Sequence, residues 1–158
     1  MFGRGVLILV AIFLFSLSVH PNEKEKFVFT HGETSYFPLV NNGQPVSVVV
    51  DDIDHKGVQR AVADLRTDFQ KVTGNTPKSK KEKLSIIVGT VSKSTLIDNL
   101  IKDGKIDAKS IEGKNEKYII TTIENPVEGV EKALVIAGSD KRGTIYGVYE
   151  LSAQIGVS

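Results

Sequence analysis

The sequence predicts an α+β fold, in which a mixed sheet of about four to five strands carries helices packed on one face. Three observations support this fold class. Strand-like and helix-like segments alternate along most of the chain. Two successive strand–helix–strand steps favour parallel neighbours joined by right-handed crossovers. The last two strands are joined by a connection short enough for an antiparallel pair.

The first half of the chain supplies the first of these steps. Val46–Val50 is rich in β-branched residues, which is typical of a buried strand. The next segment repeats apolar residues at helical spacing and ends at Thr73-Gly74. Its apolar stripe consists of Val58, Ala61, Val62, Leu65, Phe69 and Val72. Upstream, Phe27–Thr30 and Tyr36–Val40 are predicted as two short strands.

The second half begins with another buried strand at Leu84–Val88, closed by Gly89-Thr90. A shorter helix follows around Leu96–Ile101, with a serine as its cap. The two remaining strands are predicted at Tyr118–Ile123 and Ala133–Ala137.

The segment Ala137–Ser158 combines a strand end, a charged turn and the start of a helix. Asp140 is a good N-cap, because its carboxylate can accept hydrogen bonds from the unpaired N–H groups of the first helical turn. The predicted apolar face of this helix consists of Ile145, Val148, Tyr149, Ser152 and Ile155. Gly143 and Gly147 lie inside the helix, where glycine costs about 1 kcal/mol relative to alanine. Glycine at such positions indicates that another segment lies close to the helix.

The N-terminus predicts a secretory signal peptide over residues 1–18. Arg4 precedes the apolar run Val6–Phe15, and small residues stand at the two positions that a cut after residue 18 requires. An uncleaved membrane anchor is the alternative, although the run is shorter than the about 20 apolar residues that span a bilayer. Residues 19–26 then form a charged tail, and residues 27–158 form one domain. The protein is therefore predicted to be secreted or periplasmic, with membrane contact only through the signal peptide.

The composition argues against several classes of function. The formal net charge is +1, and removal of residues 1–18 takes away Arg4 and no acid, which leaves 0. This balance gives no general attraction to nucleic acid. The chain has no cysteine, so disulfides and a lipid anchor on cysteine are excluded. The short basic cluster Lys78, Lys80, Lys81 and Lys83 is interpreted as a solvated loop.

Acidic residues gather directly after the strand Val46–Val50. Asp51, Asp52, Asp54 and His55 are of types that bind metal ions, but no further ligand stands at a recognisable spacing. Asp54 has a structural role available, because it can cap the helix that follows. We therefore assign no metal site, no cofactor and no catalytic residue in this chain.

The charged turn of Asp140, Lys141 and Arg142 is the candidate site. In one interpretation, Asp140 caps the helix while Arg142 pairs with a carboxylate or reaches across a domain boundary. In the other, the three residues border a site for a sugar acid, because a helix start with two cations can hold an anion. Both interpretations remain open on the sequence alone.

Several segments, taken together, match a known pattern. They are Val46–Val50, Gly57–Ala61 with Asp64-Leu65 and Asp68, Val72–Gly74, Ile86–Thr90, Gly104–Asp107, above all Ile136–Tyr149, and then Leu151-Ser152 and Gln154–Ser158. Over residues 27–158 the chain resembles the N-terminal domain of glycoside hydrolase family 115, the xylan α-1,2-glucuronidases. The shorter core Arg-Gly-x-x-Tyr-Gly is similar to one seen before the barrels of other glycosidases, such as hexosaminidases.

The resemblance implies that the chain belongs to a larger enzyme. In that family this α/β domain precedes a (β/α)-barrel whose loops hold the catalytic acids, and the reaction is the inverting removal of glucuronic acid, or its 4-O-methyl ether, from xylan. The catalytic residues would then lie outside this chain. The implied partners are the barrel of the same polypeptide and, through it, glucuronoxylan. The domain itself would support the barrel through its terminal helix and its strand ends.

A stand-alone carbohydrate-binding or interaction domain is the alternative. Sugar platforms need exposed Trp or Tyr, and the chain has no Trp. Tyr146 and Tyr149 lie on the helix that is expected to be packed, so independent sugar binding ranks second. If a barrel covers the face Tyr146–Ile155, that face would be an apolar patch without it.

Overall fold

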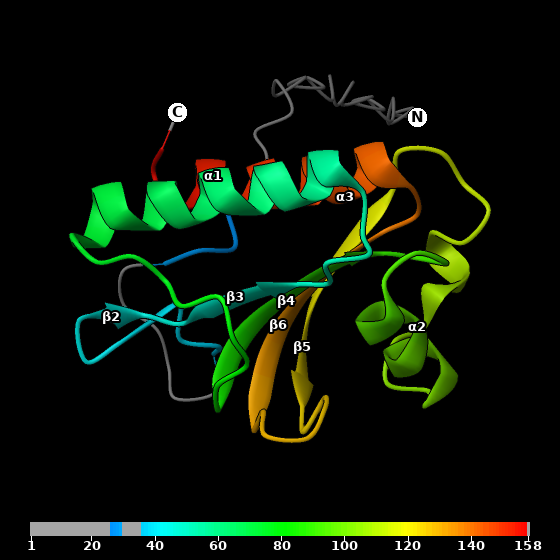
Figure 1. Cartoon of the computed structure of the whole chain (residues 1–158), viewed down its shortest axis with the longest axis horizontal. Coiled ribbons are helices and arrows are strands. Elements are labelled where there is room, and N and C mark those ends of the chain that lie inside the picture. The colour runs from blue at the N-terminus through cyan, green and yellow to red at the C-terminus, as the bar shows by residue number, and fades with distance from the viewer. Residues whose placement is uncertain (1–25, 30–35, 158) are drawn as a thin grey trace, which may run out of the picture.

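The computed structural model describes residues 26–29 and 36–157, and a four-stranded mixed sheet forms its centre (Figure 1). In spatial order its strands are β3 (Ser47–Val50), β4 (Leu84–Thr90), β6 (Lys132–Gly138) and β5 (Tyr118–Glu124). The helices are α1 (Lys56–Thr73), α2 (Thr95–Lys102) and α3 (Lys141–Gln154), with a 3-10 helix η1 at Ala108–Ser110. Two short strands, β1 (Val40–Asn41) and β2 (Gln44–Pro45), form a separate hairpin.

Three of the four central strands are parallel. Val48 of β3 pairs with Ile86 of β4, which pairs in turn with Leu134 of β6, whereas β5 runs antiparallel to β6. The predicted parallel step from β3 to β4 and the predicted antiparallel pair are therefore confirmed. The second predicted parallel step is wrong, because β6 lies between β4 and β5. The more apolar strand takes the central place: β6 is buried along almost its whole length, while β5 is largely exposed or half-buried.

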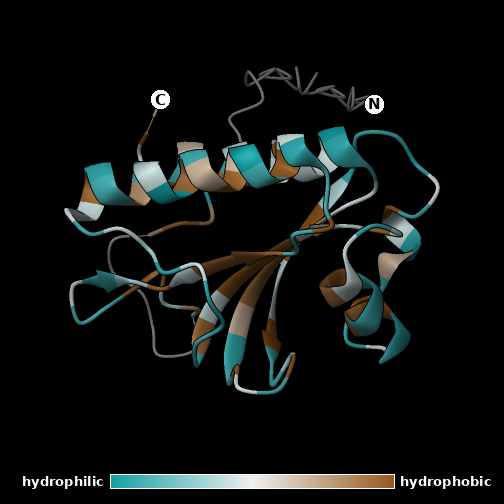
Figure 2. Cartoon of the chain, in the orientation of Figure 1, coloured by the Kyte–Doolittle hydropathy of each residue, from teal (hydrophilic) through white to brown (hydrophobic). Residues whose placement is uncertain are grey.

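Helices α1 and α3 lie side by side on one face of the sheet (Figure 1). Their apolar residues meet those of β3, β4 and β6 in one core, in which Leu65, Phe69 and Leu151 are almost fully buried. In Figure 2 the central strands are mostly hydrophobic, whereas the helices combine hydrophobic with hydrophilic residues. The hydrophilic residues remain exposed on the outer side of the helices.

Helix α2 and η1 cover the opposite face of the sheet. Ile97 and Leu100 of α2 join Ile87 and Val135, whose side chains point away from α1 and α3, in a second core. The predicted fold class is confirmed, and the placement of helices on one face holds for α1 and α3. The strands are apolar on both faces, so the face turned away from α1 and α3 also requires a cover.

The first described residues differ from the sequence-based prediction. Phe27–Phe29 form no strand, and of the predicted strand Tyr36–Val40 only its last residue belongs to β1. The hairpin turn at Asn42 and Gly43 sets this limit, because both residues have positive φ angles, 50° and 75°. This conformation is typical of two-residue hairpin turns and fixes the pairing of β1 with β2.

The predicted signal peptide over residues 1–18 and most of the predicted tail over residues 19–26 lie outside the described residues. Among the helices that the structure describes, none combines the length and the apolar character needed to cross a membrane.

Candidate functional site

Asp140 ties the start of α3 to the loop before β5. Its Oδ1 accepts a hydrogen bond from the Gly143 N–H at 2.7 Å, so the predicted N-cap is confirmed. Its Oδ2 accepts a second hydrogen bond, from the Glu116 N–H at 2.9 Å. These two backbone hydrogen bonds, with a smaller contribution from Arg142, hold the pKa of Asp140 below its usual range. Asp140 is therefore a charged structural cap that joins two segments.

Two glycines allow α3 to pack directly on the sheet and on this loop. A Cβ atom at Gly143 would lie 2.2 Å from the carbonyl oxygen of Lys117. A Cβ atom at Gly147 would lie 2.7 Å from Cγ2 of Ile136 in β6. The close approach predicted from these two glycines is therefore confirmed.

The buried face of α3 differs from the predicted one. It consists of Gly143, Thr144, Gly147, Val148, Leu151 and Ser152. Tyr149, predicted on the packed face, is 46% exposed, and Tyr146 is 40% exposed. The predicted place of Tyr149 on the packed face is therefore wrong, because Gly143 and Gly147 face the sheet and turn the large side chains of the helix outward.

Arg142 is held on the surface by two neighbours. Its Nη1 lies 2.8 Å from Oε1 of Glu116, and its Nη2 donates a hydrogen bond to the hydroxyl of Tyr146 at 2.9 Å. The guanidinium carbon also lies 5.8 Å from the centre of the Tyr146 ring. The hydrogen bond to Tyr146 and the charge of Glu116 raise the pKa of Arg142 above its usual value. The predicted pairing of Arg142 with a carboxylate is thus present within the domain.

Lys141 is the remaining member of the predicted site. Its side chain is exposed, and its ammonium group has no hydrogen-bond or ion-pair partner among the residues that the structure describes. The turn therefore presents one unengaged cation beside one arginine whose charge is already compensated. This arrangement suits contact with an acidic group of another domain or ligand, and it contains no pair of groups able to act as nucleophile and base.

A buried polar network lies beneath the turn. The carboxylate of Asp54 accepts hydrogen bonds from the N–H of Thr90 at 2.8 Å and from its hydroxyl at 2.9 Å. The Thr90 and Thr144 hydroxyls are 2.8 Å apart, and Thr144 also donates to the Asp140 carbonyl at 2.9 Å. The network joins the start of α1, the end of β4 and the start of α3. It was not predicted, because its members are far apart in sequence.

Two acids of the cluster after β3, Asp51 and Asp54, connect segments of the fold. Asp51 accepts hydrogen bonds from the Ser94 hydroxyl at 2.7 Å and from the Leu96 N–H at 2.9 Å, which fixes the start of α2. The predicted cap by Asp54 is wrong: His55 occupies the N-cap position of α1, and Asp54 is turned toward β4. Within the described residues, no group of three or more acidic, histidine or cysteine side chains could hold a metal ion.

The lysine cluster behaves as the solvated loop that was predicted. Lys78 pairs with Glu82 at 2.6 Å, and Lys83 pairs with Glu131 at 2.7 Å. Both lysines and Glu131 are largely exposed, and Glu82 is half-buried. The two glutamates compensate the charges of two of the lysines. The pairs add little to stability, because ion pairs at the surface contribute about 0–1 kcal/mol.

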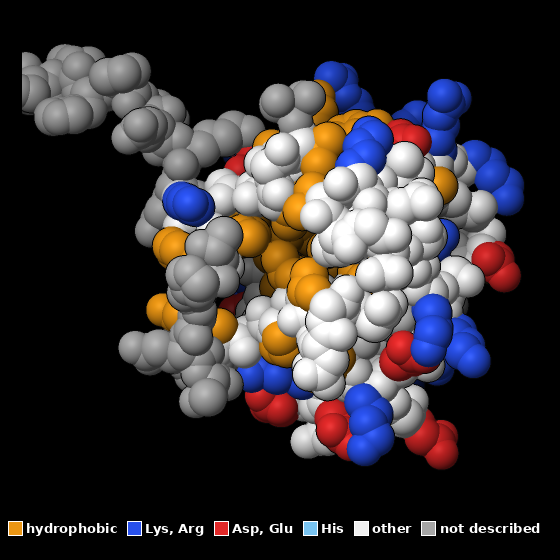
Figure 3. All heavy atoms as spheres, turned by 90° about the vertical axis from the view of Figure 1, so that its left-hand side faces the viewer, with side chains coloured by type: hydrophobic (Ala, Val, Ile, Leu, Met, Phe, Trp, Pro, Cys, Tyr) orange, Lys and Arg blue, Asp and Glu red, His pale blue; other side chains and the backbone are white. Residues whose placement is uncertain are grey.

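A hydrophobic surface that was not predicted lies where α1 and α3 end. On the face shown in Figure 3, hydrophobic side chains gather beside the β1–β2 hairpin. Exposed apolar residues of this region are Phe27, Phe29, Tyr36, Val40 and Val72. The rings of Phe29 and Tyr36 stack with their centres 6.2 Å apart. Such an aromatic pair could contact a sugar ring or another protein surface.

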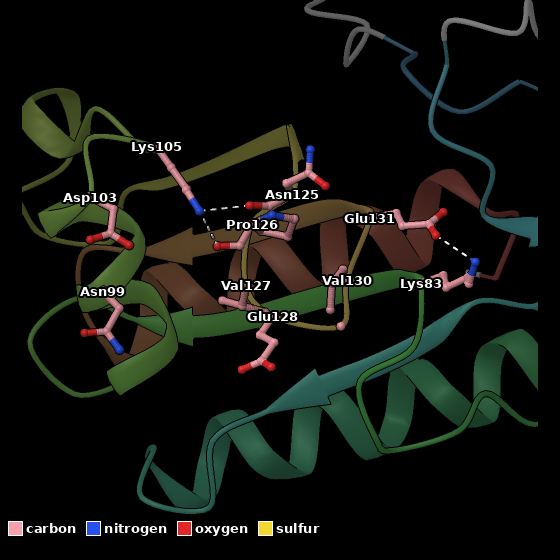
Figure 4. A pocket seen from close by; sticks show the side chains of 11 residues that line it. Lys83, Asn99, Asp103, Lys105, Asn125, Pro126, Val127, Glu128, Val130 and Glu131 are labelled. Atoms are coloured by element: carbon pink, nitrogen blue, oxygen red, sulfur yellow. Dashed lines mark hydrogen bonds and ion pairs between the residues drawn. The ribbon is translucent and has the colours of Figure 1, made fainter.

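A hollow of about 690 Å³ lies between the end of α2 and the β5–β6 connection (Figure 4). Lys105 closes one side by donating hydrogen bonds to the carbonyl oxygens of Asn125 and Pro126, both at 2.8 Å. None of the residues that line the hollow is aromatic. It therefore lacks the stacking surface on which sugar binding usually depends.

The comparisons with known proteins agree with the sheet and helix arrangement. Residues 39–151 match the family described as Glycosyl hydrolase family 67 N-terminus. A comparison with curated proteins gave no match. Among solved structures, the chain is similar to "a novel family GH115 4-O-Methyl-alpha-glucuronidase, BtGH115A, with specificity for decorated arabinogalactans". The identity is 30% and the TM-score 0.60, over 75% of this chain and 14% of that one.

A second similar structure is that of CpGH84D, with 12% identity and a TM-score of 0.51, over 72% of this chain and 18% of that one. At this identity the similarity shows the fold alone. The chain spans less than a fifth of either structure. The predicted resemblance is confirmed at the level of an N-terminal domain of a glycoside hydrolase. Since the family match covers most of its length, the chain belongs to the glycosyl hydrolase family 67 N-terminus family.

Proposed function

We propose that the chain is the non-catalytic N-terminal domain of a secreted family 115 α-glucuronidase that releases (4-O-methyl-)glucuronic acid from xylan. The observation that carries this proposal is the similarity, at 30% identity, to the GH115 4-O-methyl-α-glucuronidase. The polar side chains of the domain support a structural role. Asp51, Asp54 and Asp140 are all engaged in hydrogen bonds that hold its own segments together.

The proposed reaction needs groups that belong to another part of the polypeptide. Inverting hydrolysis requires one carboxylic acid and one carboxylate about 6.5–9.5 Å apart, with a water molecule between the carboxylate and the sugar. In the proposed enzyme a (β/α)-barrel following this domain supplies both. The role of the present domain is to hold that barrel, and the predicted signal peptide over residues 1–18 directs the whole polypeptide out of the cytoplasm.

The exposed side of α3 is the proposed contact with the barrel. Arg142 and Tyr146 are prearranged there by their mutual hydrogen bond and by Glu116. Arginine and tyrosine are enriched at the centres of protein interfaces, because they bury a large area with little loss of side-chain freedom. Lys141 adds a cation without a described partner, suited to an acidic group on the barrel.

The first experiment is an assay of the full-length polypeptide on oligosaccharides of glucuronoxylan. The expected product is 4-O-methylglucuronic acid, and NMR of the first product formed should show inversion at the anomeric carbon. A folded, full-length protein that releases no uronic acid from xylan or from arabinogalactan would overturn the proposed activity.

A second experiment separates the two interpretations of the charged turn. In the full-length protein, Arg142→Ala is expected to lower the melting temperature while kcat and KM stay within about twofold of the original values. Lys109→Ala, which removes an exposed cation from η1 on the other face, is the matched control and should change neither. A large rise in KM with an unchanged melting temperature would instead assign Arg142 to a sugar-acid site.

Direct carbohydrate binding is the second candidate function, favoured by the exposed rings of Tyr146 and Tyr149 and by the stacked pair of Phe29 and Tyr36. Calorimetric titration of this chain with glucuronoxylan oligosaccharides tests it. Saturable binding that Tyr146→Ala or Tyr36→Ala abolishes would replace the supporting role with a binding role.

A further inference from the structure

Strand β5 forms one edge of the central sheet, and half of its backbone groups point away from the protein. Their direction follows from the ends of the β5–β6 ladder. The Ser139 N–H donates to the Lys117 carbonyl at 2.8 Å, and the Asn125 N–H donates to the Glu131 carbonyl at 2.7 Å. Both pairs continue the regular register of the ladder, so the odd-numbered residues of β5 exchange hydrogen bonds with β6.

The even-numbered residues of β5 therefore direct their N–H and C=O groups to the outer edge. No hydrogen bond among the described residues joins the backbone of Ile120, Thr122 or Glu124 to a segment beyond the sheet. The hydrogen bonds of β6 support this assignment. Gly138, which pairs with Tyr118, directs its carbonyl away from β5 and accepts a hydrogen bond from the Val91 N–H on the side facing β4.

At the opposite edge of the sheet, the outward backbone groups of Val48 in β3 are hydrogen-bonded to other segments of the chain. At β3, the Val48 N–H donates to the Lys78 carbonyl at 2.9 Å, and the Val48 carbonyl accepts from Nη2 of Arg66 at 2.6 Å. Edge strands usually avoid pairing by carrying lysine, proline or a bulge. Over its seven residues β5 has none of these, and six of them are β-branched or aromatic.

We propose that the β5 edge binds a second copy of this chain, and that the two β5 strands pair in antiparallel fashion to continue the sheet across a two-fold axis. With the axis at Thr121, Ile120 of one copy faces Thr122 of the other. Residues of the same parity then meet, so each outward N–H faces an outward C=O.

The side chains of β5 fit this pairing. On the side covered by α2, Ile119 faces Ile123 of the second copy and the two Thr121 side chains face each other, and such pairs stabilise neighbouring strands. On the other side, Tyr118 faces Glu124. Lys117 faces Asn125, so no like charges oppose each other along the strand. This self-complementarity is the reason for choosing a second copy as the occupant.

Sedimentation and amide hydrogen exchange of this chain test the proposal together. The mass is expected to double with rising concentration. At high concentration the amides of Ile120, Thr122 and Glu124 should become protected, and on dilution they should exchange at least about tenfold faster. The amides of Ile119 and Thr121, which bond to β6, should stay protected throughout. A monomer at all accessible concentrations, or a dimer with unprotected even-numbered amides, would overturn the proposal.

Two substitutions at one position sharpen the test. Thr122→Pro removes an outward N–H without removing a bond to β6, and it should abolish the dimer. Thr122→Lys, which keeps the backbone donor, should weaken dimerisation by about tenfold or more and guards against misfolding of the proline variant. Thr67→Lys adds the same charge on the exposed side of α1 and should dimerise normally. Protection of the even-numbered amides in a monomer would show that another segment of the polypeptide covers the edge, and would also refute the dimer.

Discussion

A single methyl group added at Gly143 tests the close packing of α3. In Gly143→Ala, the new Cβ would lie 2.2 Å from the Lys117 carbonyl oxygen, whereas real contacts of this kind begin at 3.0 Å, so the two segments must separate by at least 0.8 Å. Overpacking of this kind costs about 1–3 kcal/mol. The obstacle is backbone, which cannot rotate away, so we expect the upper value. Alanine returns about 1 kcal/mol of helix propensity, which leaves a net loss of about 2 kcal/mol.

Urea unfolding followed by circular dichroism measures this loss. With a dependence on urea of about 1–3 kcal/mol per molar, the midpoint should fall by about 1 M. Gly57→Ala is the matched control, because its Cβ would meet Cδ1 of Ile145 at 3.4 Å, an ordinary contact. That variant should gain up to about 1 kcal/mol. A Gly143→Ala protein as stable as the original would refute the inferred contact with Lys117.

Three further predictions concern carboxylates. Asp140→Ala should lower the free energy of unfolding by about 1–2 kcal/mol, and Asp140→Asn, which keeps a capping oxygen, by less; urea titration compares them. Asp54→Ala leaves the buried N–H of Thr90 without its acceptor, whereas the Thr90 hydroxyl can donate to the Thr144 hydroxyl 2.8 Å away. A loss of about 1–3 kcal/mol is expected in the same assay, and a loss under about 1 kcal/mol would contradict the network. For Asp68, burial opposes the charged form, but hydrogen bonds from Ser152 and Lys71 outweigh it and lower the pKa, as the cap bonds do for Asp140. The stabilisation that these two carboxylates contribute should therefore be fully present above the ordinary pKa of 3.8, and it should be lost as the pH falls through their lower pKa values in the folded state. Thermal unfolding at a series of pH values should detect this loss, and Asp140→Asn should reduce it.

Most elements of the fold could be predicted, because their apolar periodicity depends on local sequence alone. The helix stripe from Val58 to Phe69 and the uniform burial of β4 and β6 are of this kind. Neighbour relations could not be predicted in the same way. Periodicity indicates how deeply a strand is buried, but not which strand lies beside it. The rule that consecutive strands joined by a helix are usually neighbours therefore did not predict that β6 lies between β4 and β5.

The candidate site shows the same division. The capping role of Asp140 and the close approach at Gly143 follow from residue type and position, and both were predicted. The partner of Arg142 could not be named, because Glu116 reaches it from a turn in which its own φ angle is 57°. Such a turn has no clear sequence signal when the residue is not glycine. The buried contact of Thr90 with Thr144 likewise needs the folded sheet to bring distant residues together.

The place of β6 also determines when the domain can fold during synthesis. In the register of the sheet, Leu84 pairs with Lys132, a separation of 48 residues, and β6 is the last of the sheet strands to be made. At about 5–20 residues per second, the ribosome takes about 2–10 s to travel from the start of β4 to the start of β6. During that interval the Ile- and Val-rich edge of β4 has no neighbour on one side. The nascent domain therefore cannot fold strand by strand from its N-terminus, and it should require protection by chaperones until β6 and α3 emerge and complete both cores in one step.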